Sequence, residues 1–295
     1  MIKRNSRHTF ALLNVDRVQL SSQWNYANII SPYNRIYYIN SGRGELSDSS
    51  GRIVLEKGYL YLIPSFTMCS MACDEHMEQF FVQFFEDSIN GVSIFSNIRS
   101  ILKTDASSLD VELFLRLLHI NPHRGINRSF NPLIYEKDEF YKECQQLNAQ
   151  QNQSVYLETQ GIIQQLSSRF LSLVPDKVNG LKHIPDKISE IVSYILTNLH
   201  QPLLVSELAS MANQHPDYFS RQFKLLTGSR PLNFIIEKRI ERAQYLMATS
   251  SMNYTEIGTA LGFEDRSHFS KTFKKMTGLT PGEYKKQLYS VGFEH

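Results

Sequence analysis

Basic and hydroxyl side chains recur in two nearly identical segments of this chain. The residues FSRQFKLLTG begin at Phe219, and the residues FSKTFKKMTG begin at Phe269. Arginine can grip guanine through two hydrogen bonds, and serine or lysine can bind base edges or phosphates. These residue types, written twice at the same spacing, make nucleic-acid binding the first chemistry to test against the rest of the sequence.

The cysteines predict neither a metal site nor a disulfide framework. Cys69, Cys73 and Cys144 are odd in number, and they do not combine with histidines into a set with the spacing of a zinc site. Cys69 and Cys73 could form a redox pair, but a place in or beside a strand favours two free thiols. We therefore expect no metal and no cofactor.

The composition is that of a globular protein with two domains. The chain has 295 residues, of which 42% are hydrophobic and 20% are charged, which suits two separate cores. Residues 181–295 carry 14 lysines and arginines against 11 acidic residues, and this small excess does not by itself indicate a nucleic-acid partner. Since no apolar run of membrane-spanning length and no signal-peptide pattern occurs, we expect a cytoplasmic protein without a membrane segment.

Two kinds of secondary structure divide the chain. Residues 10–86 have aromatic and β-branched residues broken by turn residues, which predicts a sandwich or barrel in which SDSSGR forms a hairpin turn. From about residue 107 the apolar spacing is helical. The prolines, glycine and charges of residues 175–185 predict a linker. We expect a first domain over residues 1–174 and a second, all-helical domain over residues 186–295.

One apolar stripe runs along the last helix predicted before the linker. Ile163, Leu166 and Phe170 lie three and four residues apart, and Tyr156 and Leu173 continue the same face. Such a stripe must be covered by other side chains. It packs either on the barrel or on a second copy of the chain, and the sequence leaves both open.

The repeat predicts two helix-turn-helix units. Residues 215–231 and 265–281 share seven identities at an offset of 50, and SELASMAN (206–213) is similar to TEIGTALG (255–262) at an offset of 49. The second copy therefore has one more residue between its two helices. The turn residue is asparagine in the first copy and glycine in the second, and both types tolerate left-handed backbone angles.

Capping residues mark the helix starts more clearly in the second copy than in the first. Segments 253–256 and 280–283 begin and end with the residues of a capping box. In the first copy Leu204 and His215 stand where asparagine or serine would cap better, while Pro216 suits a first helical turn. We therefore expect the helices of the first copy to fray more.

Between the two copies, residues 231–249 predict one helix of 19 residues, which at 1.5 Å per residue is about 28 Å long. Successive major grooves on one face of B-DNA are about 34 Å apart. A stiff helix of this length suits two recognition helices in adjacent grooves. The alternative is an all-helical bundle with an old duplication and no DNA role, but it leaves the outward polar positions of both second helices unexplained.

Residues 186–290 resemble the AraC/XylS type of DNA-binding domain. The resemblance rests on LASMANQHPDYFSRQFKLLTGSRP in the first copy and on IGTALGFEDRSHFSKTFKKMTGLTP in the second. Gly258 and Arg230 depart from the usual pattern, which has alanine at the first position and serine or threonine at the other. The resemblance implies a transcription regulator with double-stranded DNA and RNA polymerase as partners.

The resemblance also implies which side chains contact DNA. Those expected at base edges are Asp217, Ser220, Arg221, Arg266, Ser267, His268 and Lys271. Those expected at phosphates, or else only to aid solubility, are Lys224, Lys274, Lys275, Lys285 and Lys286. For each base reader, a phosphate contact or a solvated position is the alternative. Asp217 fits least well, because a carboxylate repels phosphates unless it accepts from a cytosine amino group.

The segment RIYYINSGRGELSDSSGRIVLEKGYLYLIPS resembles the cupin-like sensor barrel that precedes such DNA-binding domains, through a Gly-x-Gly turn, a hairpin and the ending GYLYLIP. The resemblance implies a small-molecule effector and a homodimer, with Ile163, Leu166 and Phe170 as dimer contacts. Candidates for an effector pocket are aromatic residues with a few polar groups: Trp24, Tyr26, Arg35, Tyr37, Tyr61 and His76. Ordinary barrel core is the alternative for each of them.

We therefore predict an α+β protein: an N-terminal cupin-like β-barrel with following helices, and a C-terminal all-α domain of two helix-turn-helix units joined by a long helix. The predicted function is sequence-specific regulation of transcription, as an activator that responds to a small molecule and is not an enzyme. One alternative is a cupin-type metal-dependent enzyme tethered to DNA, which the single His76 of FTMCSMACDEHMEQF disfavours. The other is a regulator without a ligand.

Overall fold

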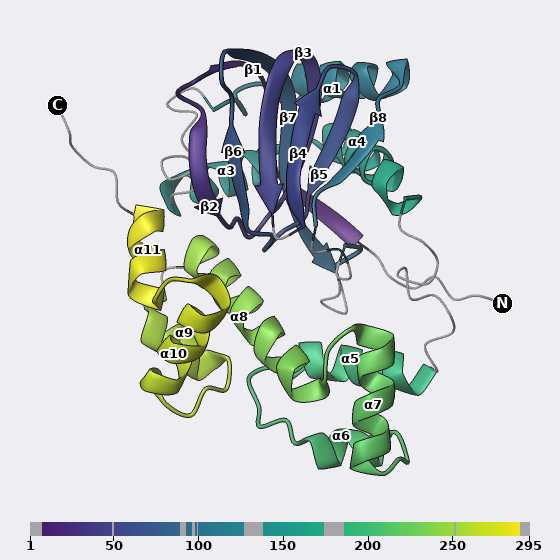
Figure 1. Cartoon of the computed structure of the whole chain (residues 1–295), viewed down its shortest axis with the longest axis vertical. Helices are drawn as coiled ribbons and strands as arrows, with labels where there is room; N and C mark the ends of the chain where they lie inside the picture. Colours follow the sequence, from purple (N-terminus) through teal and green to yellow (C-terminus); the bar gives the residue numbers. More distant parts are fainter. Residues whose placement is uncertain are drawn as a thin grey trace. The chain divides into compact units, whose positions relative to one another are not determined.

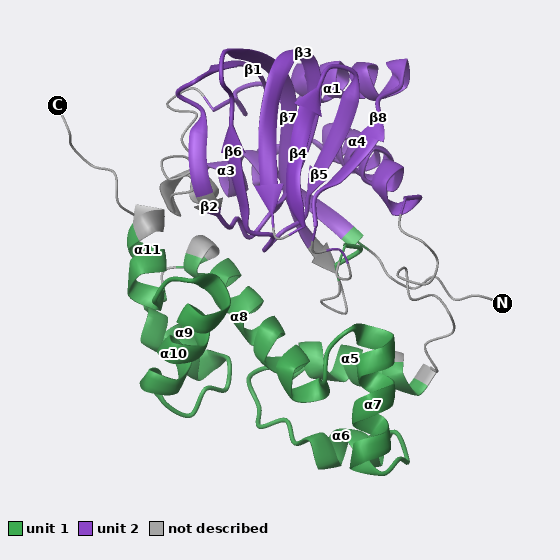
Figure 2. Cartoon of the chain, viewed as in Figure 1, with its two compact units in different colours: residues 1–8, 88–97, 174–287 green, residues 9–87, 98–173, 288–295 purple. Residues whose placement is uncertain are grey.

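The structure divides the chain into two compact units, shown in Figure 2. The computed structural model describes residues 8–48, 50–88, 93–95, 98, 100–126, 138–173, 186–250 and 252–289. One unit is rich in strands and built mainly from residues 9–87 and 98–173, and the other is helical and built mainly from residues 174–287. The linker predicted over residues 175–185 lies outside the described residues, so this boundary stays a prediction.

The α+β fold class is confirmed, with strands first and helices after them. The strands are β1 (His8–Ser21), β2 (Asn25–Ile29), β3 (Asn34–Asp48), β4 (Gly51–Glu56), β5 (Tyr59–Ile63), β6 (Cys69–Ala72), β7 (His76–Ser88) and β8 (Leu102–Asp105). The helices are α1 (Ser108–Ile120), α3 (Asp138–Gln150), α4 (Gln153–Leu171), α5 (Asp186–Thr197), α6 (Val205–Met211), α7 (Pro216–Thr227), α8 (Pro231–Thr249), α9 (Tyr254–Ala260), α10 (Arg266–Thr277) and α11 (Pro281–Tyr289). Strand β8 lies beyond the region that the sequence predicted as strands. Among the described helices, none combines the length and the apolar character needed to cross a bilayer.

Strand β3 organises the sheet-rich unit, because its 15 residues pair with four other strands. Its first part is antiparallel to β5 and β7, and its second part is antiparallel to β4 and β6. The main path through the sheet is β1-β7-β3-β5-β8, with β2 joined through β6 (Figure 1). One strand shared by both halves of the sheet lets it curve around a common apolar interior.

The Gly-x-Gly turn predicted at residues 42–44 is wrong, because these residues lie inside β3. A register shift between Ile39 and Ser41 precedes Gly42, which has a φ of +74°. The backbone there passes so close to β7 that a Cβ at residue 42 would stand 2.1 Å from the carbonyl oxygen of His76. The glycine is therefore needed for a bulge within the strand.

The hairpin predicted at SDSSGR is confirmed, since Asp48 lies opposite Gly51.

Two apolar layers hold the sheet-rich unit together. Inside the sheet, aromatic and aliphatic side chains form one cluster that includes Trp24, Tyr37, Tyr61, Phe81 and Met77. Outside that cluster, helix α1 packs on β3 and β7 through the rings of Tyr38, Phe80 and Phe114, whose centroids are 5.8 to 6.4 Å apart. Helix α4 lies against α1 and β8. In Figure 1 these two helices lie behind the sheet.

In the helical unit, α6 with α7 and α9 with α10 form two helix-turn-helix pairs, and α8 runs between them (Figure 1). The bounds of α8 are those predicted from the sequence. In each pair two phenylalanines of the second helix point inward: Phe219 and Phe223 are fully buried in the first pair, and Phe269 and Phe273 in the second. The predicted core face of both copies is therefore confirmed.

The two turns differ as the offsets predicted. Four residues separate α6 from α7 and five separate α9 from α10. Asn213 and Gly262 both have left-handed backbone angles, with φ of 53° and 73°. A side chain at residue 262 would also stand 3.0 Å from the carbonyl oxygen of Leu199, so the second turn requires glycine for space as well as for conformation.

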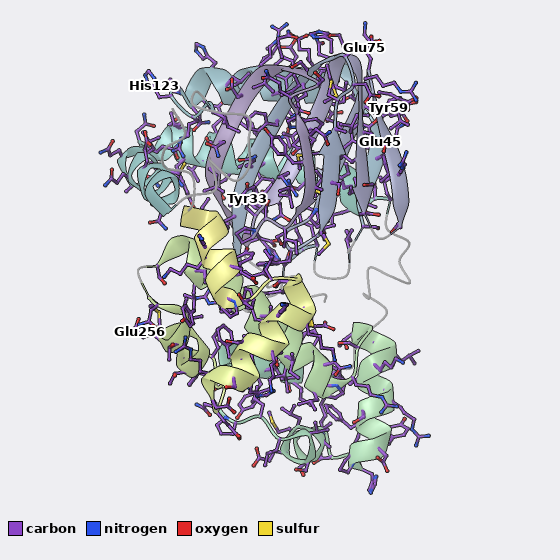
Figure 3. The ribbon with its side chains drawn as sticks, turned by 60° about the vertical axis from the view of Figure 1, so that its left-hand side comes forward. Tyr33, Glu45, Tyr59, Glu75, His123 and Glu256 are labelled. Atoms are coloured by element: carbon purple, nitrogen blue, oxygen red, sulfur yellow. The ribbon has the colours of Figure 1, made fainter. Side chains whose placement is uncertain are left out.

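As predicted, the second copy has a capping box and the first copy has weaker caps. Two caps that were not predicted are also present, at His215 and Asp265. The box at the start of α9 is formed, since Asn253 N donates to Glu256 Oε2 at 2.8 Å and Glu256 N donates to Asn253 Oδ1 at 3.0 Å; Figure 3 labels Glu256. Leu204 makes no side-chain cap at α6. His215 does accept a long hydrogen bond of 3.4 Å from Asp217 N. Asp265, which the sequence analysis did not name, caps α10 by accepting from His268 N at 2.7 Å.

Candidate nucleic-acid interface

The predicted DNA-contacting residues lie at exposed or half-buried positions of α7 and α10, whose phenylalanines are buried. Eight of them are exposed and Ser220 is half-buried; the exposed ones are Asp217, Arg221, Lys224, Arg266, Ser267, His268, Lys271 and Lys274. Each helix therefore presents one polar face, and its other face anchors it to the core. This is the arrangement that a recognition helix needs, because only its outward side chains can enter a groove.

The two helices differ in charge. Helix α10 carries four basic side chains and no acidic one, whereas α7 carries two basic side chains and one acidic. Leu225, which is 83% exposed on α7, occupies the position that Lys275 occupies on α10. Because phosphate binding depends on the number of cations, we expect α10 to contribute more of the attraction to the DNA backbone.

Arg266 is held in place by a side chain from the preceding helix. Its guanidinium carbon lies 4.9 Å from the centroid of the Tyr254 ring, and its Nη2 donates to the Tyr254 hydroxyl. Tyr254 is the first residue of α9, and Arg266 is the first residue of α10. The sequence analysis missed Tyr254, since nothing in the repeat or its spacing singles it out.

Other predicted readers have local contacts that limit their freedom. The His268 ring packs edge-on against Phe263 at a centroid distance of 5.6 Å. Arg221 Nε donates to the backbone oxygen of Asp217 at 3.3 Å, one helical turn earlier. The Asp217 carboxylate lies 3.9 Å from His215 Nδ1. A weak contact to a histidine leaves the negative charge of Asp217 near the DNA-facing surface, so it stays the least expected base reader.

One half-buried guanidinium connects the segment after α5 with the turn of the second helix-turn-helix pair. Arg239 on α8 donates from Nε to Leu199 O at 3.0 Å, from Nη1 to Gly262 O at 2.9 Å and from Nη2 to Gln201 O at 2.7 Å. It also lies over the Phe263 ring at 5.7 Å. Burial lowers the pKa of Arg239, although an arginine remains charged at neutral pH. Arg239 thus ties the segment after α5 to the turn of the second pair.

The lysines expected at phosphates divide into two groups. Lys224, Lys274 and Lys275 project from exposed positions at the C-terminal ends of α7 and α10. Lys285 on α11 instead donates from Nζ to the carbonyl oxygen of Met252 at 2.6 Å. Lys285 therefore has a structural contact, and it is a weaker candidate for the DNA backbone than the other three.

All six effector candidates belong to the sheet-rich unit, and four of them lie in or against its apolar core. Trp24, Tyr37 and Tyr61 are buried in the apolar cluster, and Tyr26 packs against it. The Tyr61 hydroxyl is occupied, since it donates to Val54 O at 2.9 Å and accepts from Glu56 N at 2.8 Å. These contacts favour the barrel-core alternative for Tyr61.

The two charged candidates lie in different surroundings. Arg35 is fully buried, and its Nη2 donates to Cys69 Sγ at 3.2 Å. His76 is exposed at the start of β7. In the described part of the chain, no three histidine, cysteine or acidic side chains gather as metal ligands would. The effector roles of these residues stay predictions.

The predicted dimer contacts are interior residues. Ile163, Leu166 and Phe170 have no exposed surface in the single chain. Helix α4 is fixed over the sheet by Gln160, which accepts from Phe10 N at 2.7 Å. Of the two alternatives for this stripe, the structure favours packing within the chain, because side chains without exposed surface cannot touch a second subunit. The homodimer itself stays a prediction.

The helical unit has the architecture of a double helix-turn-helix DNA-binding domain: two pairs with exposed polar second helices, separated by one long helix. Residues 208–287 match a family model described as a helix-turn-helix domain. Over 99 residues the chain is 36% identical to the uncharacterized HTH-type transcriptional regulator YobQ of Bacillus subtilis. This alignment covers 34% of this chain and 41% of the relative. Over 145 residues it is 31% identical to the arabinose operon regulatory protein of Escherichia coli, covering 47% of this chain and 48% of the relative.

These matches identify the C-terminal part of the chain as an AraC-type helix-turn-helix domain. The chain spans less than half the length of the two curated relatives. The fold of nearly the whole chain is similar to a structure of ToxT from Vibrio cholerae, with 16% identity, 96% of this chain and 100% of that chain covered, and a TM-score of 0.52. ToxT bound to (E)-4-(8-methylnaphthalen-1-yl)but-3-enoic acid matches at 17% identity over 95% of this chain and 99% of that chain, with a TM-score of 0.50. At these identities the likeness concerns the fold alone.

Proposed function

We propose that this protein is a sequence-specific DNA-binding regulator of transcription, whose helices α7 and α10 enter two adjacent major grooves. The observation that carries the proposal is the pair of exposed polar faces on α7 and α10, on either side of α8. The 19 residues of α8 give a length of about 28 Å, which is close to the 34 Å or so between successive grooves on one side of B-DNA.

Within this proposal the exposed residues have different tasks. Arg266 and Arg221 are suited to guanine, since a guanidinium can donate two parallel hydrogen bonds to its major-groove edge. Ser220, Ser267, His268 and Lys271 lie near enough in sequence to take part in readout from the same faces. Lys224 and Lys274 are suited to phosphates, which fix the position of the protein but carry no sequence information.

The test is a selection of bound duplexes from a randomised DNA pool by the full chain, with heparin present as a competing polyanion. We expect enrichment of a site with two conserved segments about one helical turn apart. If no site is enriched and heparin competes as well as any duplex, the proposal is refuted. A basic surface alone would attract both polyanions equally.

Two alanine variants then separate base readout from phosphate binding. Arg266→Ala is expected to cost about 1–3 kcal/mol on the selected site and to relax the preference at one base pair. Lys274→Ala is expected to weaken binding to all duplexes alike and to reduce the salt dependence by about one unit of slope. Equal losses on selected and random DNA for Arg266→Ala would remove Arg266 from the base readers. Both affinities are measured by fluorescence anisotropy at several salt concentrations.

We further propose that the sheet-rich unit binds a small-molecule effector. Support comes from its aromatic interior, where Trp24, Tyr26 and Tyr37 lie together, and from the ligand in the similar fold of ToxT. Trp24 is the single tryptophan of the chain, so its fluorescence reports on this unit alone. Metabolites are screened for a change in Trp24 emission together with a rise in melting temperature. A regulator without a ligand would show neither.

Four finer features complete the proposal: a cytoplasmic location, a homodimer, activation through RNA polymerase, and no catalytic activity. The names of the curated relatives support a regulatory role and describe no reaction. Light scattering tests the dimer, and transcription with purified polymerase from a promoter next to the selected site tests activation. Stoichiometric iron, manganese or zinc in the purified protein would instead favour the metal-dependent enzyme.

A further inference from the structure

The contact between Tyr254 and Arg266 has no counterpart in the first helix-turn-helix pair. At the offset of 49 residues Tyr254 corresponds to Val205, and at the offset of 50 residues Arg266 corresponds to Pro216. The first pair folds with the same buried phenylalanines and the same kind of turn. A helix-turn-helix pair of this chain therefore does not need the tyrosine and arginine contact in order to form.

Arg266 is also poorly placed to stabilise its own helix. It is the first residue of α10, where the backbone N–H groups carry a partial positive charge and acidic side chains are favoured. The cap at this end comes from Asp265, whose Oδ1 accepts from His268 N. Since the fold gains little from a cation here, the position of Arg266 points to a ligand that carries negative charge or acceptor atoms.

The geometry leaves the guanidinium ready to bind. One of its nitrogens donates to the Tyr254 hydroxyl, and its central carbon lies over the tyrosine ring, 4.9 Å from the ring centroid. An arginine has five N–H donors in a fixed fork, so several remain for a partner. Arg266 stays exposed in this arrangement, while Tyr254 is half-buried at the start of α9.

We propose that Tyr254 is a positioning residue for base recognition: it holds the Arg266 guanidinium in the orientation that reads guanine in the major groove. This inference rests on the proposed function. An arginine side chain that is free in solution loses rotamer freedom when it binds, and holding it beforehand removes part of that loss. Tyr254 acts through Arg266 and does not itself contact the base.

The test uses the full chain, the DNA site selected by the unmodified protein, and copies of that site with each base pair replaced in turn. Tyr254→Leu removes both the ring and the hydroxyl, and Tyr254→Phe keeps the ring alone. We expect Tyr254→Leu to lower the discrimination at the base pair read by Arg266 by about 3- to 10-fold, with Tyr254→Phe in between. Affinity for random duplexes should be unchanged in both variants, because no charge is removed.

The double variant Tyr254→Leu with Arg266→Ala separates positioning from a structural role. If Tyr254 acts through Arg266, the double variant should discriminate no less than Arg266→Ala alone. Losses that add, or a loss that is equal for selected and random DNA, would overturn the inference and assign Tyr254 to the stability of the second pair. Melting curves of all variants check that each one folds.

The proposed function can fail separately from this inference. If the unmodified chain shows no base preference, the proposed function is refuted and the inference falls with it. If the unmodified chain shows a preference that Tyr254→Leu leaves intact, the proposed function stands and only the inference is overturned.

Discussion

Replacing Arg239 by alanine should weaken the attachment of the second helix-turn-helix pair to the segment after α5. The guanidinium makes two part-buried hydrogen bonds, to Leu199 O and Gly262 O, and one exposed bond to Gln201 O. A hydrogen bond that involves a charged group contributes about 1.5–3 kcal/mol when buried. Taking the lower end for the two part-buried bonds, and nothing for the exposed one, we expect a loss of about 3 kcal/mol.

The loss should appear in the helical unit alone. Hydrogen exchange of amides in α5, α8 and α9 measures the free energy of opening of that unit. Trp24 fluorescence follows the sheet-rich unit in the same sample, and we expect its transition to be unchanged. The Arg239→Ala variant should also lose more affinity for the two-segment DNA site than for either half of it, because the second pair is held less firmly against the segment after α5.

Two control variants test the reasoning. Arg239→Lys keeps the charge but replaces the fork with a single ammonium, so it should recover only part of the loss. Arg242→Ala removes a neighbouring arginine that is exposed on the same helix and lies over the Tyr245 ring at 4.7 Å, and its cost should be below about 1 kcal/mol. The account of Arg239 is refuted if Arg239→Ala and Arg242→Ala destabilise α8 and α9 equally.

Three further predictions concern single groups. Asp265→Ala removes the cap of α10 and should cost about 1 kcal/mol, seen as faster hydrogen exchange in its first turn, whereas Asp265→Ser should keep most of the protection. The hydrogen bonds from Thr280 to Glu283 hold the pKa of the Glu283 carboxyl below its ordinary value, so its stabilisation exists at neutral pH and is lost as pH falls through the folded pKa. The stability difference between the unmodified chain and Glu283→Gln should therefore shrink as the pH falls below the ordinary pKa of a glutamate, about 4.3, and a difference that does not change with pH would contradict the cap. Burial raises the pKa of the Cys144 thiol to about 11, so this thiol should react with disulfide reagents at pH 8 roughly a hundredfold more slowly in the native chain than in urea; equal rates would contradict its burial.

Much of the helical unit could be predicted because its pattern is local. The bounds of α8, the extra residue of the second turn, and the left-handed Asn213 and Gly262 all follow from spacing and residue type. The exposed positions of Lys271 and Lys274 follow from the same period, since the period turns both away from the buried Phe269 and Phe273. The repeat makes the prediction firmer, because the helix bounds and turn positions inferred in one copy can be checked against the other copy.

The sheet-rich unit was less predictable because its contacts are long-range. Gly42 looks like a turn residue in sequence, and only the close passage of β3 and β7 makes it a bulge. The stripe of Ile163, Leu166 and Phe170 was recognised as a face to be covered, but its partner is set by how α4 lies on the sheet. Periodicity identifies a buried face without identifying what buries it.

The sequence by itself determined the helices of the C-terminal part and the type of DNA-binding domain, since helix periods, turn residues and a duplicated motif act over a few residues. Only the tertiary structure decided which side chains work together. Tyr254 meets Arg266 across a turn, and Arg239 meets Leu199 and Gly262 across separate segments. These pairings depend on how whole helices pack together, and the spacing of residues along the chain does not predict that packing.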